Sequence, residues 1–427
     1  MTSIPGPVVR RAAALALVVV VALSPGAHAD SDDGGNPIDL GGTPTGTSTD
    51  GGNPVMVEAG LWSFTMDRGE SLPRQFAYRR TDGDTSVHVS VTATPGEPGE
   101  TLKVEAFAQD GTSCGSDTAS AHSDDAWSAV GADLEVGPEA FGDRNSPCLT
   151  DEVIRFEVGP TTSPRASDSD LPMTIKIVEE SPLTNPDQEL PEVPEAEPPF
   201  RAPGTGEDRG DVEGSTSFDA PLLESGTWTS TVHEGEQRLY RVHLEWGQTL
   251  AAQVDVAAYG ESELEEMSPF APDLEVELYS PMRRDVDSSF DDTTSSGSTG
   301  DEALELTSGV GPVRYLNRYD GLNAYLPGDY YVSVRAETPY SDRATVDVAF
   351  TLTVEVQGDV AGKPTYVDEK PFLVGEGVRS GAASGNPPPE PDGSGWIDAR
   401  HLSGLGLGAF GLVCLGLGGL LLRRRSS

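Results

Sequence analysis

Apolar and polar residues alternate with a period of two in six segments of the chain, which predicts β-strands. The apolar positions hold mainly Val, Ile, Leu and aromatic residues, and Gly, Pro and Asp punctuate the segments. This pattern is typical of antiparallel sheets packed face to face. Away from the two ends, no stretch shows sustained helical periodicity, so the sequence predicts an all-β protein. The six segments are residues 87–91, 102–107, 153–158, 274–279, 331–334 and 350–356.

Two long segments of this β-rich region also resemble each other. Glu58-Ala59-Gly60-Leu61-Trp62 matches Glu224-Ser225-Gly226-Thr227-Trp228 at an offset of 166 residues, and Gly69-Glu70 matches Gly235-Glu236 at the same offset. Further along, residues 76–79 correspond to residues 239–241, and the strand at Leu102 corresponds to the strand at Leu274. We therefore expect a tandem duplication of one jelly-roll-like β-sandwich, at residues 54–180 and 215–357. The repeated Trp is expected to anchor each core rather than to contact a ligand.

The N-terminal 29 residues have the organisation of a secretory signal peptide. Arg10 and Arg11 precede an apolar run at 12–23, which is too short to span a bilayer. Ala27-His28-Ala29 has the small-x-small form that signal peptidase recognises, so we expect cleavage between Ala29 and Asp30. General secretion is favoured over the twin-arginine route, because small alanines follow the arginine pair. A buried N-terminal helix is disfavoured, because nothing amphipathic follows the run.

A second apolar run lies near the C-terminus. Residues 402–422, from Leu402 to Leu422, contain no charge and are followed by Arg423, Arg424 and Arg425. About twenty apolar residues suffice to span a bilayer, and basic residues stay on its cytoplasmic side. We therefore predict a single-pass membrane protein of the type I orientation, with an extracellular ectodomain and a cytoplasmic tail at 423–427. A cleaved wall-sorting signal is the alternative, but residues 395–401 contain no Leu-Pro-x-Thr-Gly-like motif. Gly404 and Gly408 have the spacing of close helix pairs, yet the oligomeric state stays open.

Composition assigns the remaining segments. Residues 30–53 are rich in Gly, Thr, Ser and Asp, which predicts a disordered leader. Residues 181–214 are rich in Pro and Glu, which predicts a stiff, extended linker. Residues 358–401 are polar and contain three consecutive prolines, so we expect a juxtamembrane stalk.

The chain is strongly acidic, with 28 basic and 70 acidic residues and a net charge of −42. Residues 30–399 carry 22 basic and 70 acidic residues, a net charge of −48. Such a surface repels phosphates and anionic lipid headgroups, so nucleic acid is excluded as a partner. The same surface would attract cations and basic proteins, although solubility alone also accounts for it.

Two of the three cysteines are predicted to form a disulfide. Cys114 and Cys148 lie in the exported region, where paired thiols oxidise, whereas Cys414 lies inside the predicted span. Closing this loop would stabilise the fold by about 3–4 kcal/mol in the chain-entropy model. Two cysteines without neighbouring histidines make a poor zinc site, so no metal is assigned to them.

The second segment resembles a known bacterial family. Four of its elements follow one another in the order found in the pre-peptidase C-terminal domain. They are Gly235-Glu236-Gln237-Arg238-Leu239-Tyr240-Arg241-Val242, Gly247-Gln248-Thr249-Leu250, the strand at 273–279, and Pro327-Gly328-Asp329-Tyr330-Tyr331-Val332. The resemblance covers residues 223–357 and implies a jelly-roll-like sandwich that accompanies secreted peptidases without being catalytic. The first segment departs from this pattern at Pro73 and in its cysteine-bearing loop. No protease domain accompanies the segment here.

Motifs for catalysis and ligand binding are sparse. Gly111-Thr112-Ser113-Cys114-Gly115 fits a nucleophile elbow, but no helical pattern follows it. The ectodomain histidines form no metal-binding pair, and the acidic turns lack the spacing of an EF-hand loop. Arg209-Gly210-Asp211 matches an integrin-binding tripeptide, but so short a motif recurs by chance. These histidines are His88, His122, His233 and His243, with His401 at the predicted membrane edge, and the turns are 82–84, 285–287 and 291–292.

The sequence therefore predicts a non-enzymatic cell-surface protein without cofactor or metal. We expect its two sandwiches to interact with an extracellular or envelope protein or with a wall polymer. One alternative is an accessory subunit of a secreted peptidase or membrane complex. The other is a hydrolase of unfamiliar pattern, for which Ser113 is the candidate nucleophile.

Overall fold

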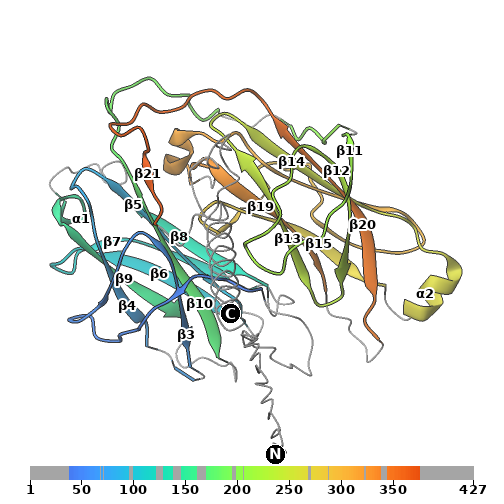
Figure 1. The fold of residues 1–427 in the computed structure, drawn as a ribbon, viewed down its shortest axis with the longest axis horizontal. Coiled ribbons are helices and arrows are strands. Elements are labelled where there is room, and N and C mark those ends of the chain that lie inside the picture. The colour runs from blue at the N-terminus through green and yellow to red at the C-terminus, as the bar shows by residue number, and fades with distance from the viewer. Residues whose placement is uncertain are drawn as a thin grey trace, which may run out of the picture. The chain divides into compact units, whose positions relative to one another are not determined.

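The computed structural model describes residues 38–375, apart from 68, 71, 96–99, 122–127, 138–145, 161–169, 195–198, 205, 268–270, 287, 322–323 and 338–343. Strands dominate this part of the chain (Figure 1). The helices described are short: α1 (Pro147–Thr150), α2 (Glu261–Met267) and the 3-10 helix η1 (Tyr315–Tyr319). The predicted all-β fold is confirmed.

The first sandwich consists of two sheets. One has the strand order β1 (Thr43–Pro44), β3 (Gly60–Met66), β10 (Leu171–Glu180), β5 (Ser86–Ala93) and β8 (Val130–Val136), with β21 (Phe372–Leu373) also paired to β10. The other has the order β2 (Val55–Val57), β4 (Arg74–Arg79), β9 (Val153–Pro160), β6 (Thr101–Phe107) and β7 (Ser113–Ser120). Side chains from both sheets share one buried core, which includes Phe76, Val89, Val104, Phe156 and Ile175.

The second sandwich repeats this arrangement. Its first sheet has the order β11 (Asp208–Asp211), β12 (Gly226–His233), β20 (Asp347–Gln357), β14 (Thr249–Val256) and β18 (Leu304–Val310). Its second sheet has the order β13 (Gln237–Leu244), β19 (Gly328–Ala336), β15 (Asp273–Tyr279) and β16 (Asp285–Val286), with β17 (Ser296–Ser298) also paired to β15. Its core includes Tyr240, Val254, Val276, Val332 and Leu352.

The repeated tryptophans occupy equivalent places. Trp62 of β3 faces Ile175 of β10, and Trp228 of β12 faces Leu352 of β20. Each indole N–H donates to a backbone carbonyl four residues earlier, at 2.9 Å in the first sandwich and 3.3 Å in the second. Both indoles pack partly buried against their own core. The Glu-x-Gly-x-Trp repeat therefore marks the same structural corner in the two halves.

Three segments that composition alone assigned to irregular chain contribute to the fold. In the predicted leader, residues 38–53 include β1, and Ile38 and Leu40 are buried. The predicted linker supplies β11, which pairs parallel with β12. The predicted stalk supplies β21, which pairs with the end of β10. Composition misled here because a segment with few or no apolar residues can still be held by backbone pairing with another strand, as β11 is, or by one or two buried side chains.

The predicted signal peptide, the predicted span at 402–422 and the basic residues after it lie outside the described residues. Within the part that the structure describes, no helix has the length and apolar character needed to cross a bilayer. The secretion and membrane assignments stay predictions.

Candidate binding site on the first sandwich

An open depression of about 450 Å³ lies on the outer face of the sheet that contains β4, β9, β6 and β7. Its lining combines three charged side chains with small and rigid residues, and none of them is aromatic. Because these side chains alternate with the buried core residues of the same strands, they point away from the core. The lining residues are Pro73, Lys103, Glu105, Thr118, Glu157, Gly159 and Pro160.

Two carboxylates in the lining of this depression stand directly opposite each other on neighbouring strands. Glu105 of β6 is directly paired with Glu157 of β9. Side chains in such a position lie about 5 Å apart, and like charges there destabilise a sheet. Lys103 forms an ion pair with Glu105 at 2.5 Å, and Ser113 Oγ lies 3.4 Å from the other oxygen of Glu105. The depression therefore keeps one carboxylate, that of Glu157, in excess over its cation.

The duplication allows this face to be compared position by position with the second sandwich. Phe76 contacts Phe64, two residues after Trp62, and Tyr240 is hydrogen-bonded to Ser230, two residues after Trp228. Phe76 and Tyr240 are therefore equivalent, which aligns β4 with β13. Since each pairs with a known residue of the next strand, β9 aligns with β19 and β6 with β15.

In this alignment Gly159 occupies the position of Arg335. Arg335 is a buried side chain that forms an ion pair with Glu275, its cross-strand neighbour. In the first sandwich the same two positions hold Gly159 and Lys103, which are also paired. The depression therefore lies where the second sandwich has a large cationic side chain.

A second difference concerns the donors available to the central carboxylate. Glu277 is equivalent to Glu105, and it accepts from the Gln237 amide at 3.3 Å and from the Tyr279 hydroxyl at 3.0 Å. Pro73 stands at the position of Gln237, so the first sandwich has no amide there. Because Ser333 stands at the position of Glu157, the second sandwich also lacks the opposed carboxylate. The second sandwich thus satisfies this face internally, and the first does not.

A different group of titratable residues is buried between the two sandwiches. His88 Nε2 lies 2.8 Å from Glu180 Oε2, and His88 Nδ1 lies 3.9 Å from Glu135 Oε2. These three side chains are close enough to share a metal ion. However, Arg318 Nη1 lies 2.9 Å from both Glu135 and Glu180, and its guanidinium stacks 3.8 Å from the Tyr315 ring centroid. Arg318 already supplies the cation, so we assign this group a structural role.

The protonation of this buried group follows from its neighbours. Burial opposes ionisation of Glu180, but Arg318 and the hydrogen bond with His88 outweigh it and lower the pKa of Glu180 to about 2. The same neighbourhood contains Lys176, whose pKa burial lowers well below its ordinary value. Lys176 donates to the Pro281 carbonyl of the second sandwich. These contacts join charged positions on the outer side of β10 to loops of the second sandwich.

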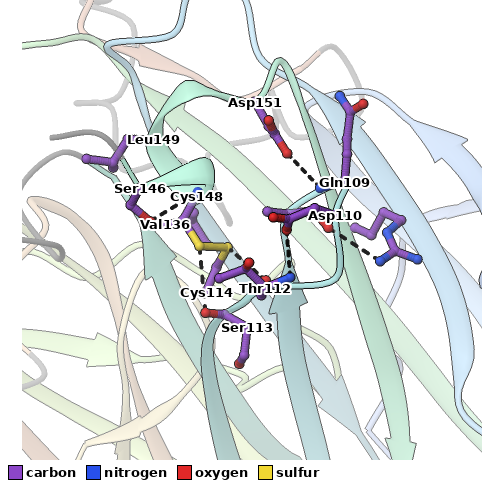
Figure 2. Close-up of a disulfide and its surroundings, with 12 residues drawn as sticks. Gln109, Asp110, Thr112, Ser113, Cys114, Val136, Ser146, Cys148, Leu149 and Asp151 are labelled. Atoms are coloured by element: carbon purple, nitrogen blue, oxygen red, sulfur yellow. Dashed lines mark hydrogen bonds between the residues drawn. A yellow bond between two sulfur atoms is a disulfide. The ribbon is translucent and has the colours of Figure 1, made fainter. Parts of the chain in front are cut away.

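The predicted disulfide is present. Cys114 and Cys148 are joined with their Cα atoms 5.5 Å apart, and the bond ties the start of β7 to α1 (Figure 2). In Figure 2 the Asp110 and Asp151 carboxylates accept backbone hydrogen bonds beside it, from Thr112 at 2.8 Å and from Gln109 at 2.7 Å. This loop is held as a structural corner.

The other candidate residues have ordinary surroundings. Ser113 lies on an exposed strand rather than on a strand-to-helix turn, and its hydroxyl faces Glu105. His233 pairs with Asp347, and His243 with Asp329, both at 2.8 Å. Arg209 of the tripeptide motif lies 3.3 Å from Glu224. Within the described residues, the acidic turns at 82–84, 285–287 and 291–292 form no grouping of three metal-ligating side chains. His122, Asp287 and His401 lie outside the described residues.

No family model and no curated protein matches this chain. Among solved structures, a secreted protein from Eubacterium rectale covers 70% of this chain and 78% of its own, with 8% identity and a TM-score of 0.17. A tandem CBM22 domain of Paenibacillus barcinonensis Xyn10C covers 70% of this chain and 87% of its own, with 9% identity and a TM-score of 0.17. Likenesses this remote carry no functional argument. The resemblance to the pre-peptidase C-terminal domain therefore stays a prediction.

The sequence did not single out the depression. The pairing of Glu105 with Glu157 depends on the register of two strands that lie about fifty residues apart. One signal was available: once the repeat is aligned, Gly159 and Pro73 stand opposite Arg335 and Gln237. The loops before β4 and β13 differ in length, so one fixed offset does not align the residues after them. Matching Gly159 and Pro73 to Arg335 and Gln237 therefore requires the strand register.

Proposed function

We propose that this protein is a non-enzymatic, membrane-anchored surface protein that binds an extracellular protein through the depression on its first sandwich. The observation that carries the proposal is the pair of opposed carboxylates in that depression, of which Glu105 has Lys103 as its cation and Glu157 is in excess. Like charges placed opposite each other on a sheet lower the stability of the free protein. Their presence is explained if a ligand binds the two carboxylates and balances their charge. A protein partner is favoured over a wall polymer, because the lining offers no aromatic ring on which a sugar could stack.

The position of the depression suits a partner that approaches from outside. Gly375, the last described residue of the predicted stalk, packs against Ala59 and Gly60 at the start of β3. Gly159 packs against Met66 at the other end of β3. Seven residues of strand separate these points by about 20 Å. The predicted tether and the depression are therefore at opposite ends of the first sandwich.

Crosslinking in intact cells tests this proposal. A photoreactive amino acid would be placed at Thr118, which is exposed and lines the depression. The matched control would carry it at Thr229, an exposed threonine on β12 of the second sandwich. We expect a discrete protein adduct from position 118 that position 229 does not give. Equal adducts from both positions, a polymer adduct at position 118, or no adduct there would contradict the proposal.

A further inference from the structure

The second sandwich shows what the depression lacks. At the equivalent face, Arg335 balances Glu275, and the Gln237 amide donates to Glu277. In the first sandwich, Gly159 and Pro73 offer no side-chain donor at these two positions. Two carboxylates, Glu105 and Glu157, face the space that the missing side chains leave. Each face has two carboxylates and one cation, but only in the second sandwich do both carboxylates have N–H donors, from Arg335 and Gln237. What the first sandwich lacks is therefore a group that carries several N–H donors.

A guanidinium group meets this requirement better than an ammonium group. Its planar fork of five N–H donors can bond two carboxylates at once, whereas an ammonium acts as a compact point charge. The carboxylates of Glu105 and Glu157, which are cross-strand neighbours, present acceptors side by side next to the Gly159 position. Pro73 and Pro160 add rigid apolar walls along which the methylene groups of an arginine could pack.

We propose that the depression receives an arginine side chain of the partner protein, in the space that corresponds to Arg335 of the second sandwich. This inference rests on the proposed function and specifies the chemistry of its site. The guanidinium bonds to Glu157 and Glu105, and Lys103 keeps its ion pair with Glu105. The carboxylate of Glu157 then gains N–H donors, as the carboxylate of Glu277 has from Gln237 within the second sandwich.

The surrounding charge favours the same kind of partner. Residues 30–399 carry a net charge of −48, so a basic protein is attracted at long range before the specific contact forms. Long-range attraction of this kind weakens as salt is added. The local contact between a guanidinium and two carboxylates in the depression weakens less, because it is short and partly shielded. Binding should therefore keep its dependence on arginine at physiological salt.

A peptide pair measures this dependence on the full chain in detergent. The probe is a labelled nine-residue peptide of Gly, Ser and Thr with one central arginine, and its control carries citrulline, which has a similar shape but no charge. Fluorescence anisotropy at about 0.15 M salt would give both affinities. We expect the arginine peptide to bind at least about tenfold more tightly than the citrulline peptide. Equal affinities would overturn the proposal.

Three variants locate the contact. Glu157→Ser, which installs the residue of the second sandwich, should weaken binding of the arginine peptide by about tenfold or more. Glu305→Ser removes the same charge from an exposed position of β18 in the second sandwich and should change affinity by less than about twofold. Gly159→Arg should abolish binding by filling the depression, although a Cβ there lies 3.2 Å from the Pro73 backbone. Equal effects of Glu157→Ser and Glu305→Ser would refute the site whatever happens to Gly159→Arg.

The crosslinking experiment separates this inference from the proposed function. If position 118 captures a protein specifically while the arginine and citrulline peptides bind equally, the docking site stands and its arginine specificity is wrong. If the arginine peptide binds more tightly than the citrulline peptide but position 118 captures no protein, the depression binds guanidinium and the proposed cellular role is wrong.

Discussion

The two sandwiches share one strand order, but a different outer sheet face is covered by other parts of the chain in each. The outer side of β10, β5 and β8 in the first sandwich is buried and carries His88, Lys176 and Glu180. The equivalent positions of the second sandwich hold Ala251, Thr353 and Gln357. The charged set is present only where loops of the other sandwich supply Arg318 and the Pro281 carbonyl. On this face, the polar set in the first sandwich is matched by contacts from the second.

The opposite faces show the reverse difference. In the second sandwich, Leu239, Tyr279 and Tyr331 lie on the outer face of their sheet and are buried by residues that include Ile38, Leu40 and Phe218. The corresponding face of the first sandwich is polar and contains the depression. The inward positions of both copies stay apolar because each must fill a closed core. The outward positions were free to diverge, and they distinguish a covered face from an open one.

The largest expected effect comes from removing the cation buried between the sandwiches. Arg318→Met leaves Glu135 and Glu180 buried without their guanidinium, which should lower the free energy of unfolding by about 3–5 kcal/mol. Denaturant titration would measure it. Arg79→Met, at an ion pair exposed to solvent, is the control and should change stability by less than about 1 kcal/mol. Similar losses in both variants would contradict the structural role of Arg318.

The disulfide belongs to the first sandwich alone. Replacing Cys114 and Cys148 together by Ser should lower stability by about 3–4 kcal/mol, because the unfolded chain regains the entropy of an open loop. Thermal unfolding of the variant and of the reduced wild type should agree. If reduction leaves the midpoint unchanged, the bond does not stabilise the fold.

The covered face of the second sandwich should be more sensitive than the open face of the first. Ile38→Ala removes a buried side chain from the cluster over β13 and β19 and should destabilise by about 2–4 kcal/mol. Met56→Ala, at an exposed position of β2, should change stability by less than about 0.5 kcal/mol. Chemical denaturation of the two variants gives the comparison, and equal effects would show that residues 38–40 do not bind to the face.

The second sandwich should lose stability at alkaline pH. Burial disfavours protonated His243, but the hydrogen bond with Asp329 and the nearby carboxylate of Glu245 outweigh it and raise the pKa to about 9. The stabilising effect, about 2–3 kcal/mol, is therefore complete below about pH 6.5 and is lost as the pH rises through about 9. Stability measured from pH 6 to 10 should show this decline in the wild type and not in His243→Gln.

The smallest effect is an expected gain. Glu157→Ser removes one of two opposed carboxylates and should raise the stability of the free protein by about 0.2–1 kcal/mol. Thermal unfolding without ligand would measure it. A loss of stability would mean that Glu157 already has a favourable partner, and the open face would then resemble the closed one.

Much of the fold could be predicted from local patterns. The alternating segments became strands β5, β6, β9, β15, β19 and β20, and both cysteines of the disulfide were identified. These features depend on periodicity and on the chemistry of thiols, which a single sequence displays. The segments at 38–53, 208–211 and 372–373 were missed, because they are held by pairing with another strand and, at Ile38, Leu40 and Phe372, by burial of single apolar side chains.

The sequence by itself determined the alternating strands, the duplicated tryptophan corner, the paired cysteines and an acidic surface, since each depends on residues close in sequence or on composition. It also predicted, through its two apolar runs, export and a membrane anchor. Only the tertiary structure decided which outer faces are covered and that Glu105 meets Glu157 beside Gly159. Those outcomes depend on strand register and on contacts between distant segments, because the same outward residue is solvated or buried according to what packs on it.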